Sequence, residues 1–295
     1  MKIAILHDSP KPTWSSRRLM KAIEEEGHQP VYVLNTMLSS RLGYKDCGVL
    51  IGERCFDADA VIVRSLGRGI NIEVLLKRLS ILYQLEKEGK VIVNSPGSLL
   101  VARNKYLSLL LLHEAGVPVP RTLLTEDLRV ALKTLSELGK SVIKPLTGSL
   151  GLGSFYVDSV DMGYRILNAI ASLAQPIYVQ EFIEKKKSRD VRVFVVGDNV
   201  VAAAYRISES SWKTNIAQGA RAEPAKITPE LEELSIKVLK VLGLEYSGID
   251  IAEDQDGNYY VLEANASPLW RGLQQATGVD PAKHIVRHVI NLVKR

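Results

Sequence analysis

The chain has 295 residues, of which 46% are hydrophobic and 24% are charged, and its formal net charge is +5. This length and composition predict a globular protein of about two domains, and no apolar run approaches the ~18 residues of a membrane span. The mild basicity favours anionic small molecules such as nucleotides or polycarboxylates over nucleic acid. The largest basic cluster, EKKKSR at 184–189, is short and lacks interleaved aromatic residues, so we expect a solvated face.

The N-terminus and the cysteines bear on the cellular compartment. The opening run, MKIAILHD, has no long signal-peptide core and is expected to be a first strand. The chain has two cysteines, Cys47 and Cys55, without metal-ligand spacing. Two cysteines in a chain of this length indicate a reducing compartment, and we expect a cytoplasmic protein.

The first part of the chain alternates between strand and helix patterns. Predicted strands cover 2–6, 30–34, 60–64 and 90–94, and predicted helices cover 15–27 and 72–89. Such alternation predicts a mainly parallel sheet covered by helices. The NSPG turn at 94–97 then suggests an N-terminal α/β domain at 1–96.

Two further blocks follow this domain. The block at 97–184 contains a helix near 99–116, a helix at 126–139, a glycine-rich stretch at 141–157, a helix at 162–174 and the strand PIYVQEFI. The block at 185–295 contains the strands of VRVFVVGDNVVAAAYR, a helix at 229–242, a hairpin at 247–265 and a last helix. Asp280-Pro281 supplies that last helix with an N-cap and a first-turn proline.

The hairpin at 247–265, SGIDIAEDQDGNYYVLEAN, is the strongest local signal. Asp256-Gly257 between two strand-like runs predicts a two-residue turn, usually of type I′. In that register Asp250 lies directly opposite Glu263, and Asn265 shares their face. The other face has Ile249 opposite Ala264 and Ile251 opposite Leu262, as a buried core would require.

Opposed carboxylates repel unless a cation neutralises them, and these three side chains offer only oxygen ligands. Oxygen ligands without histidine or cysteine point to Mg²⁺ or Mn²⁺. The hairpin therefore predicts a metal site at Asp250, Glu263 and Asn265. The alternative is an exposed hairpin with two solvated acids, and a register error of one residue would remove the metal site.

The glycine stretch SVIKPLTGSLGLGSFYV at 141–157 matches neither GxGxxG nor a P-loop. Taken alone, it could be only a tight turn between two strands. Beside a metal site, Lys144 can meet phosphate oxygens while the backbone around Gly148, Gly151 and Gly153 presents N–H groups. We therefore interpret it as a phosphate-binding flap between strands.

Together these features resemble the ATP-grasp superfamily and, within it, the RimK-like amino-acid ligases. The resemblance runs from about Arg103 to the end of the chain, after a plausible preceding α/β domain. Its carriers, in chain order, are RNKYLSLLLLHEAGVPVPRT, VIKPLTGSLGLG, YVQEFI, RDVRVFVVGDNVVAAAYR, WKTNIAQGA, SGIDIAE and LEANASP. The resemblance implies an N-terminal parallel-sheet domain followed by a two-part ATP-grasp fold with mainly antiparallel sheets, with subdomains at 97–184 and 185–295.

The resemblance also implies roles for individual residues. It implies the same metal ligands, Asp250, Glu263 and Asn265, and two metal ions. Arg206 and Arg271 are the residues expected to hold the acceptor carboxylate and the acyl phosphate. Arg192 is a further candidate for substrate binding. The residues expected to bind ATP are Lys105, Lys144, Gly148, Gly151, Gly153, Gln180, Glu181, Phe182, Ile183, Asp190, Lys213, Thr214 and Asn215.

Structural alternatives remain for several of these residues. The family more often has arginine at the position of Lys213. Lys105 could lie on a helix surface, Asp190 could pair with Arg192 on one strand face, and Arg206 could be a strand-end charge. Arg271 could be a loop residue stacked on Trp270.

The chain has no nucleophile constellation, which fits a reaction in which ATP activates a carboxylate as an acyl phosphate that an amine then displaces. The resemblance implies an ADP-forming ligase that adds L-glutamate or a related amino acid to an acid acceptor. The segment 265–285 resembles the archaeal branch that acts on tetrahydromethanopterin or a deazaflavin coenzyme. A ribosomal or carrier-protein C-terminus is an alternative acceptor, and a non-catalytic ATP-binding module is an alternative of another class. These ligases are often dimers or tetramers, so we expect a homo-oligomer.

Overall fold

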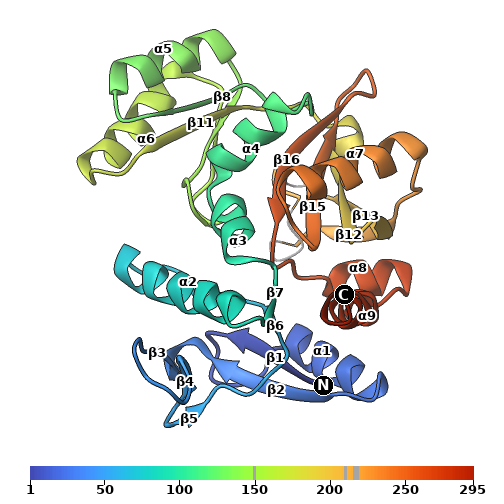
Figure 1. Cartoon of the computed structure of the whole chain (residues 1–295). Coiled ribbons are helices and arrows are strands. Elements are labelled where there is room, and N and C mark those ends of the chain that lie inside the picture. Colours follow the sequence, from blue (N-terminus) through green and yellow to red (C-terminus); the bar gives the residue numbers. More distant parts are fainter. Residues whose placement is uncertain (149–150, 209–210, 215–218) are drawn as a thin grey trace.

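The computed structural model describes residues 1–148, 151–208, 211–214 and 219–295. The chain forms a lower lobe at its N-terminus and two upper lobes (Figure 1). Among the described helices, none combines the length and the apolar character that a bilayer span requires.

The N-terminal lobe is built on a parallel sheet in the strand order β2-β1-β6-β7. Alternate side chains of the central strand enter different cores: Ile3 and Ile5 lie in the cluster that includes Leu19, and Ala4 lies in the one that includes Leu82. The sheet is therefore covered on both faces, as the alternating sequence pattern predicts. Its elements are β1 (Lys2–His7), α1 (Trp14–Glu25), β2 (Gln29–Leu34), β6 (Ala60–Val63), α2 (Ile72–Lys87) and β7 (Val91–Val93).

A small antiparallel sheet extends this lobe between β2 and β6, where no element is predicted. Its strands, after the short helix η1 (Asn35–Met37), are β3 (Leu38–Ser40), β4 (Val49–Ile51) and β5 (Arg54–Cys55).

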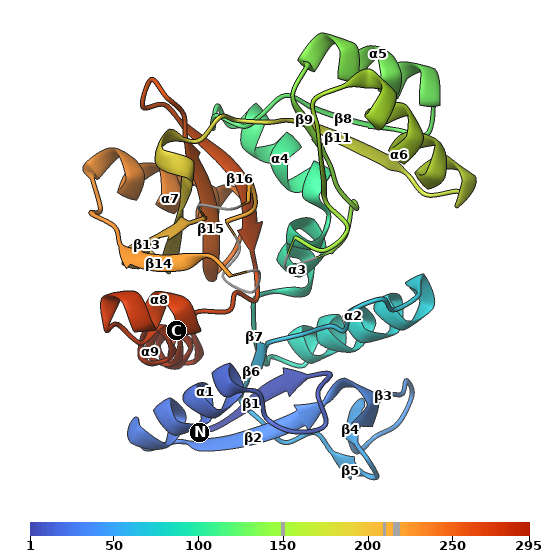
Figure 2. The ribbon, with the colours of Figure 1, turned by 180° about the vertical axis from the view of Figure 1, so that it is seen from behind.

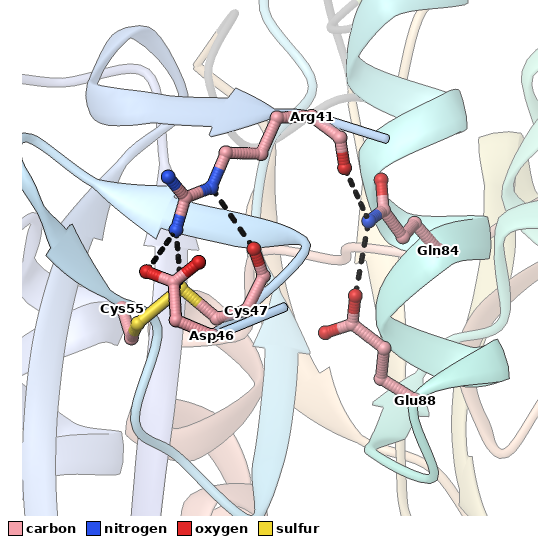
Figure 3. Close-up of a disulfide and its surroundings, with 6 residues drawn as sticks. All are labelled: Arg41, Asp46, Cys47, Cys55, Gln84 and Glu88. Carbon is pink, nitrogen blue, oxygen red and sulfur yellow. Dashed lines mark hydrogen bonds and ion pairs between the residues drawn. A yellow bond between two sulfur atoms is a disulfide. The ribbon is translucent and has the colours of Figure 1, made fainter. Parts of the chain in front are cut away.

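The β4–β5 pairing brings Cys47 and Cys55 to a Cα–Cα distance of 5.9 Å, and they form a disulfide (Figure 3). Arg41 donates to the carbonyl of Cys47 at 2.9 Å, and its own carbonyl accepts from Gln84 of α2 at 3.4 Å. This pairing differs from the interpretation of the two cysteines as signs of a reducing compartment. A tertiary hairpin, and not their spacing in sequence, brings them together.

The second lobe carries the glycine stretch on an antiparallel sheet in the order β10-β9-β11-β8. Helices α5 and α6 cover this sheet (Figure 1), and their Leu135 and Leu167 share a core with Ile143 and Val179. The lobe contains β8 (Thr122–Thr125), α5 (Leu128–Leu138), β9 (Ser141–Ile143), β10 (Phe155–Val157), α6 (Val160–Ser172) and β11 (Ile177–Glu181).

The helix predicted near 99–116 is instead two helices, α3 (Pro96–Arg103) and α4 (Lys105–Glu114). Asn104 separates them because its backbone is extended, and its side chain accepts from the N–H of Leu107 as the N-cap of α4. The break places Lys105 in the first turn of a new helix, where the sequence pattern shows only a continuous apolar segment.

The third lobe is an antiparallel sheet in the order β14-β13-β12-β15-β16. Helix α7 packs on one face, while α8 and α9 lie on the other, between this sheet and the N-terminal lobe (Figure 2). Its elements are η2 (Lys186–Ser188), β12 (Arg189–Val196), β13 (Asn199–Ile207), β14 (Arg221–Pro224), α7 (Pro229–Val241), β15 (Tyr246–Glu253), β16 (Tyr259–Asn265), α8 (Arg271–Thr277) and α9 (Pro281–Val293).

The predicted fold class is therefore confirmed: a parallel-sheet α/β domain precedes two antiparallel sheets. The proposed domain boundaries after residues 96 and 184 stay predictions.

One fully buried side chain joins the N-terminal lobe to the third lobe. Asn94 follows β7, and its amide group donates to the carbonyls of Tyr246 at 3.0 Å and Ala266 at 2.8 Å. Its side-chain oxygen accepts from the N–H groups of Glu245 at 2.6 Å and Tyr246 at 3.2 Å. All four hydrogen-bonding positions of the amide are thus used against β15, the residue before it and the segment after β16.

Replacing Asn94 should therefore destabilise the protein. We expect Asn94→Ala to lower the free energy of unfolding by about 3 kcal/mol, because several buried backbone groups lose their partners. Asn291→Ala, at an exposed position of α9, should change it by less than about 0.5 kcal/mol. Urea unfolding measures both, and equal stability of the two variants would show that the Asn94 bonds do not hold the lobes together.

Candidate functional site

The β15–β16 hairpin places Asp250 opposite Glu263, as predicted, but by a different route. The turn is not a two-residue loop: Asp254 donates to the carbonyl of Asn258 at 3.0 Å, and Gly257, with φ +92°, donates to Asp254 at 3.2 Å. This adds a residue to the loop and shifts the pairing near the turn by one position. A bulge between the two halves of the ladder restores the predicted register at Asp250.

The bulge has a consequence for the side chains of β16. Ile251 pairs with Val261 and not with Leu262, so the predicted Ile251–Leu262 pair is wrong. Leu262 becomes the extra residue, and both Leu262 and Glu263 line the same pocket. Asn265 lies two residues beyond Glu263, opposite Gly248, and therefore on the same face of the strand.

Asp250 is held by arginines from the neighbouring strand β12 and from the next strand in the sheet, β13. Arg192 of β12 is its direct cross-strand partner and binds both carboxylate oxygens, one of them at 2.8 Å. Arg206 of β13 lies 3.0 Å from the same carboxylate. Asp250 and Arg206 are each only 6% exposed.

Arg206 also binds a second buried acid. Its cross-strand partner is Asp190, 3% exposed, which accepts from the guanidinium at 2.7 and 2.9 Å. Asp190 further accepts from the Thr214 hydroxyl and lies 3.4 Å from Lys185 Nζ. Acids and bases thus alternate across three adjacent strands, a pairing that stabilises a sheet.

These contacts decide the open structural alternatives. Asp190 pairs with Arg206 and not with Arg192, and Arg206 is buried rather than a strand-end charge. Burial raises the pKa of Asp190, but Arg206, Lys185 and Thr214 outweigh it and hold that pKa below its usual value. Burial opposes the charge of Arg206, and the two aspartates outweigh it, so its pKa is raised.

Three lysines converge on the glycine stretch. Lys105 is 9% exposed and donates to the carbonyl of Gly148 at 3.0 Å, so it is not a helix-surface residue. Lys213 reaches the carbonyl of Gly151 at 3.0 Å. Burial lowers the pKa of Lys144 to about 8, with Glu263 partly opposing this effect, and burial also lowers the pKa of Lys105.

The end of β11 and the following residues form an apolar wall beside these charges. Phe182 packs edge-on against Tyr156 at 4.9 Å and Trp212 at 6.3 Å between ring centres. The N–H groups of Glu181 and Phe182 donate to backbone carbonyls, and the Glu181 carboxylate binds Arg121 at 2.8 Å. Such a wall suits a flat aromatic ligand.

One pocket joins most of the predicted site residues. Those that line it are Lys105, Lys144, Gly148, Gly151, Gln180, Glu181, Phe182, Ile183, Asp190, Arg206, Lys213, Thr214, Asp250 and Glu263. The predicted residues Gly153, Arg192, Asn265 and Arg271 are not part of its lining, and Asn215 lies outside the described residues. Arg271 is exposed at the start of α8.

The pocket also contains residues that the sequence did not single out. Lys185 donates to the Thr214 hydroxyl at 2.9 Å and is 12% exposed, so the expectation that the 184–189 cluster is entirely solvated is wrong. Arg189 of the same cluster lies over the Tyr205 ring at 3.6 Å. The other additions to the lining are Val142, Pro145, Leu152, Ser154, Trp212 and Leu262.

The donors on the hairpin fit a hard cation. Among the residues that the structure describes, none donates a hydrogen bond to the Glu263 carboxylate, which lies in a pocket with Lys105 and Lys144. Asp250 would exchange an arginine contact for the ion, and Arg206 would keep its two bonds to Asp190. The residues present can therefore accept Mg²⁺ through oxygen ligands alone.

Comparison with protein families and known proteins agrees with this geometry. Residues 102–289 match the RimK-like ATP-grasp domain, and residues 1–99 match the RimK PreATP-grasp domain. The chain belongs to the RimK-like ATP-grasp family. Since the relatives below are ligases, it is an ATP-grasp ligase by family, as the resemblance implied.

Two curated relatives cover nearly the whole chain. The tetrahydromethanopterin:alpha-L-glutamate ligase of Methanococcus maripaludis is 31% identical over 100% of this chain and 99% of its own. The alpha-aminoadipate–LysW ligase LysX of Saccharolobus solfataricus is 31% identical over 96% of this chain and 100% of its own.

Solved structures share the fold. The ATP-grasp ligase PsnB, complexed with a phosphomimetic variant of its minimal precursor, Mg and ADP, superposes with a TM-score of 0.79. It is 26% identical in sequence, and the match covers 99% of this chain and 98% of PsnB.

The arginine between the two buried aspartates should matter for stability. We expect Arg206→Met to lower the free energy of unfolding by about 3 kcal/mol, because it leaves Asp190 without its main partner. Arg129→Met removes a guanidinium that is 91% exposed and should cost less than about 0.5 kcal/mol. Urea unfolding at neutral pH compares the variants; an Arg206→Met protein as stable as the wild type would mean that the ion network contributes nothing net.

Proposed function

We propose that this ligase uses ATP to activate a carboxylate as an acyl phosphate and joins it to the amine of L-glutamate or a related amino acid. The observation that supports this most is the meeting of Asp250 and Glu263 with four lysines and a glycine loop in one pocket. The reaction needs charge neutralisation and positioning more than a protein nucleophile, and the pocket supplies both.

Different residues would bind the base and the phosphates of the nucleotide. Phe182 and Trp212 would hold adenine against the β11 end, and Lys105, Lys144 and Lys213 would neutralise phosphate oxygens. Asp250, Glu263 and Asn265 would hold Mg²⁺, or Mn²⁺, with two ions expected. A bound ion supplies charge neutralisation at the β- and γ-phosphates. The complex of PsnB with Mg and ADP supports this choice of nucleotide and metal.

Arginines would then hold the acidic groups. Arg206 and Arg192 already bind the Asp250 carboxylate, which shows that they can grip a carboxylate in this pocket or at its edge. Arg206 would hold the acyl phosphate or the acceptor carboxylate, and Arg271 would act at the start of α8. These roles are part of the proposal.

The acceptor that we propose is a cofactor tail, such as that of tetrahydromethanopterin or a deazaflavin coenzyme. The tetrahydromethanopterin ligases among the relatives support it. LysX, named for ligation of alpha-aminoadipate and LysW, supports a protein or carrier C-terminus as the second candidate. A homo-oligomer in the cytoplasm belongs to the same proposal.

A non-catalytic ATP-binding module is the candidate from another class. Such a protein would need to bind ATP but not to keep a pair of metal-ligating carboxylates beside it. Acceptor-dependent ADP release separates the two functions.

The test is ligation followed by mass spectrometry. Purified protein with ATP, Mg²⁺ and L-glutamate is given a panel of pterin, deazaflavin and peptide acceptors, and we expect one glutamyl mass increment with matching ADP release. Glu263→Gln should lower turnover by at least about a hundredfold while ADP still binds, because it removes a charged ligand of the proposed metal ion.

The control is Glu137→Gln, a change in an exposed residue of α5 that should leave turnover intact. ADP release by Glu263→Gln at the wild-type rate would refute the assignment of Glu263. Nucleotide binding without acceptor-dependent ADP release across the panel would favour the non-catalytic module.

Lys144 predicts a pH dependence of nucleotide binding. With a pKa near 8, its amine is charged below that pH and neutral above it, so ADP affinity should weaken as the pH rises through about 8. Lys144→Arg keeps its charge across this range and should remove that decline. Calorimetric titration from pH 7 to pH 10 measures both proteins, and superimposable curves would show that Lys144 does not bind the phosphates.

A further inference from the structure

Four arginines gather outside the nucleotide pocket, where the N-terminal lobe meets the rest of the molecule. We call Arg64, Arg68, Arg78 and Arg103 the arginine cluster. They come from three elements: the loop after β6, helix α2 and the end of α3. The proposed nucleotide chemistry uses none of them.

Their contacts centre on the loop 64–69. Arg78 donates to the carbonyl of Leu66 at 2.6 Å, and Arg103 donates to the next carbonyl, Gly67, through two nitrogens at 3.2 Å each. Gly67 has φ +92°, and a Cβ there would lie 2.4 Å from Arg78 Nη1. The loop therefore needs glycine to admit these guanidinium groups beside its backbone.

The hydrogen bonds of the cluster go to uncharged groups. Among the described residues, no aspartate or glutamate forms an ion pair with any of the four arginines; Arg64, Arg78 and Arg103 bond to backbone carbonyls and the Tyr246 hydroxyl. The nearby Asp8 carboxylate lies 3.0 Å from Nδ1 of His7, whose pKa is lowered chiefly by burial. Burial and then the like charge of Arg78 lower the pKa of Arg103. Asp8 lies close enough to Arg78 for that charge to help lower its own pKa, so the positive charge of the cluster is only partly compensated.

The topology also points to this place. In the sheet order β2-β1-β6-β7, the next strand in sequence, β2, lies on one side of β1, and the later strands β6 and β7 lie on the other side. The strand order therefore reverses direction at β1. In open parallel sheets, ligands bind outside the carboxyl ends of the strands at such a switch point. His7 ends β1, and Arg64 directly follows β6, so the cluster begins at this position.

Two connections join the cluster to the proposed reaction site. Arg103 is two residues before Lys105, whose amine contacts the glycine stretch at Gly148. Arg64 donates to the carbonyl of Pro268 at 2.6 Å and lies over the Trp270 ring at 4.8 Å. It thereby supports the segment that leads from Asn265 to Arg271.

We propose that the arginine cluster binds a second anionic group of the acceptor, so that the substrate class is a molecule with at least two acidic groups. One carboxylate would be activated in the nucleotide pocket while Arg68, Arg78 and Arg103 hold a carboxylate or phosphate further along the molecule. The inference rests on the proposed ligase function, because it names what that site receives. The inference also accounts for the position of Arg271, which lies at the end of the segment that Arg64 supports and outside the lining of the nucleotide pocket.

Arg68 provides the cleanest test. Its side chain is exposed, and no described residue forms a hydrogen bond or ion pair with it, so changing it should not disturb the fold. The experiment titrates tri-α-L-glutamate, and separately inorganic phosphate, into the full-length protein saturated with ADP and Mg²⁺. Calorimetry compares the wild type with Arg68→Gln, Arg68→Lys and the distant control Arg129→Gln.

We expect Arg68→Gln to weaken binding of the probe by about tenfold, Arg68→Lys to restore most of it, and Arg129→Gln to leave it unchanged. All variants should bind ADP equally. An effect with tri-glutamate identifies carboxylates as the recognised groups, and an effect with phosphate alone identifies a phosphate-bearing acceptor. Equal binding by wild type and Arg68→Gln, or no binding of either probe to the wild type, overturns the inference.

The outcome also separates this inference from the proposed function. If the wild type adds glutamate to an acceptor and Arg68→Gln has the same KM for it, the arginine cluster has no role and the ligase assignment stands. If the probes bind in an Arg68-dependent way but no acceptor gains glutamate, the anion site stands and the ligase assignment fails.

Discussion

The site depends on one arrangement of buried charge in the five-stranded sheet. Arg192 pairs across strands with Asp250, and Arg206 pairs with Asp190 while also reaching Asp250. Two acids and two bases with these geometries satisfy each other, whereas any one of them alone would be a buried charge without compensation. The same arrangement holds Asp250 opposite Glu263, so stability and the placement of the metal ligands have one cause.

This network also leaves Asp250 able to change partners. Arg206 has two hydrogen bonds to Asp190 that do not involve Asp250, and the pairing of β12 with β15 fixes the backbone position of Arg192. A cation or an acidic substrate can therefore compete for Asp250 or its arginines without unpairing every member of the network. A fully apolar core would be easier to stabilise but could not offer such exchange.

The pocket depends on how the glycine lobe sits against the third lobe. The glycine lobe supplies Lys144 and the loop that Lys105 and Lys213 contact, and the third lobe supplies the acids. Asn94 fixes the N-terminal lobe against β15 and the end of β16, close to where Arg64 supports Pro268. The arginine cluster at the edge of that lobe is consistent with the mild basicity of the whole chain, which predicts anionic small-molecule ligands.

Local sequence patterns were enough for much of the fold and part of the site. Period-two and helical patterns are set by neighbouring residues, so the parallel N-terminal sheet, the helix begun by Asp280-Pro281 and the opposition of Asp250 to Glu263 could be predicted. Only the tertiary structure decided the three-residue loop and its compensating bulge, the break at Asn104, the Cys47–Cys55 bond and the burial of Lys185. Each of these depends on backbone geometry or on a partner distant in the chain, as does the pairing of Asp190 with Arg206 across strands. Sequence spacing identifies which residues share a face, but only packing determines which opposite charge lies across from them.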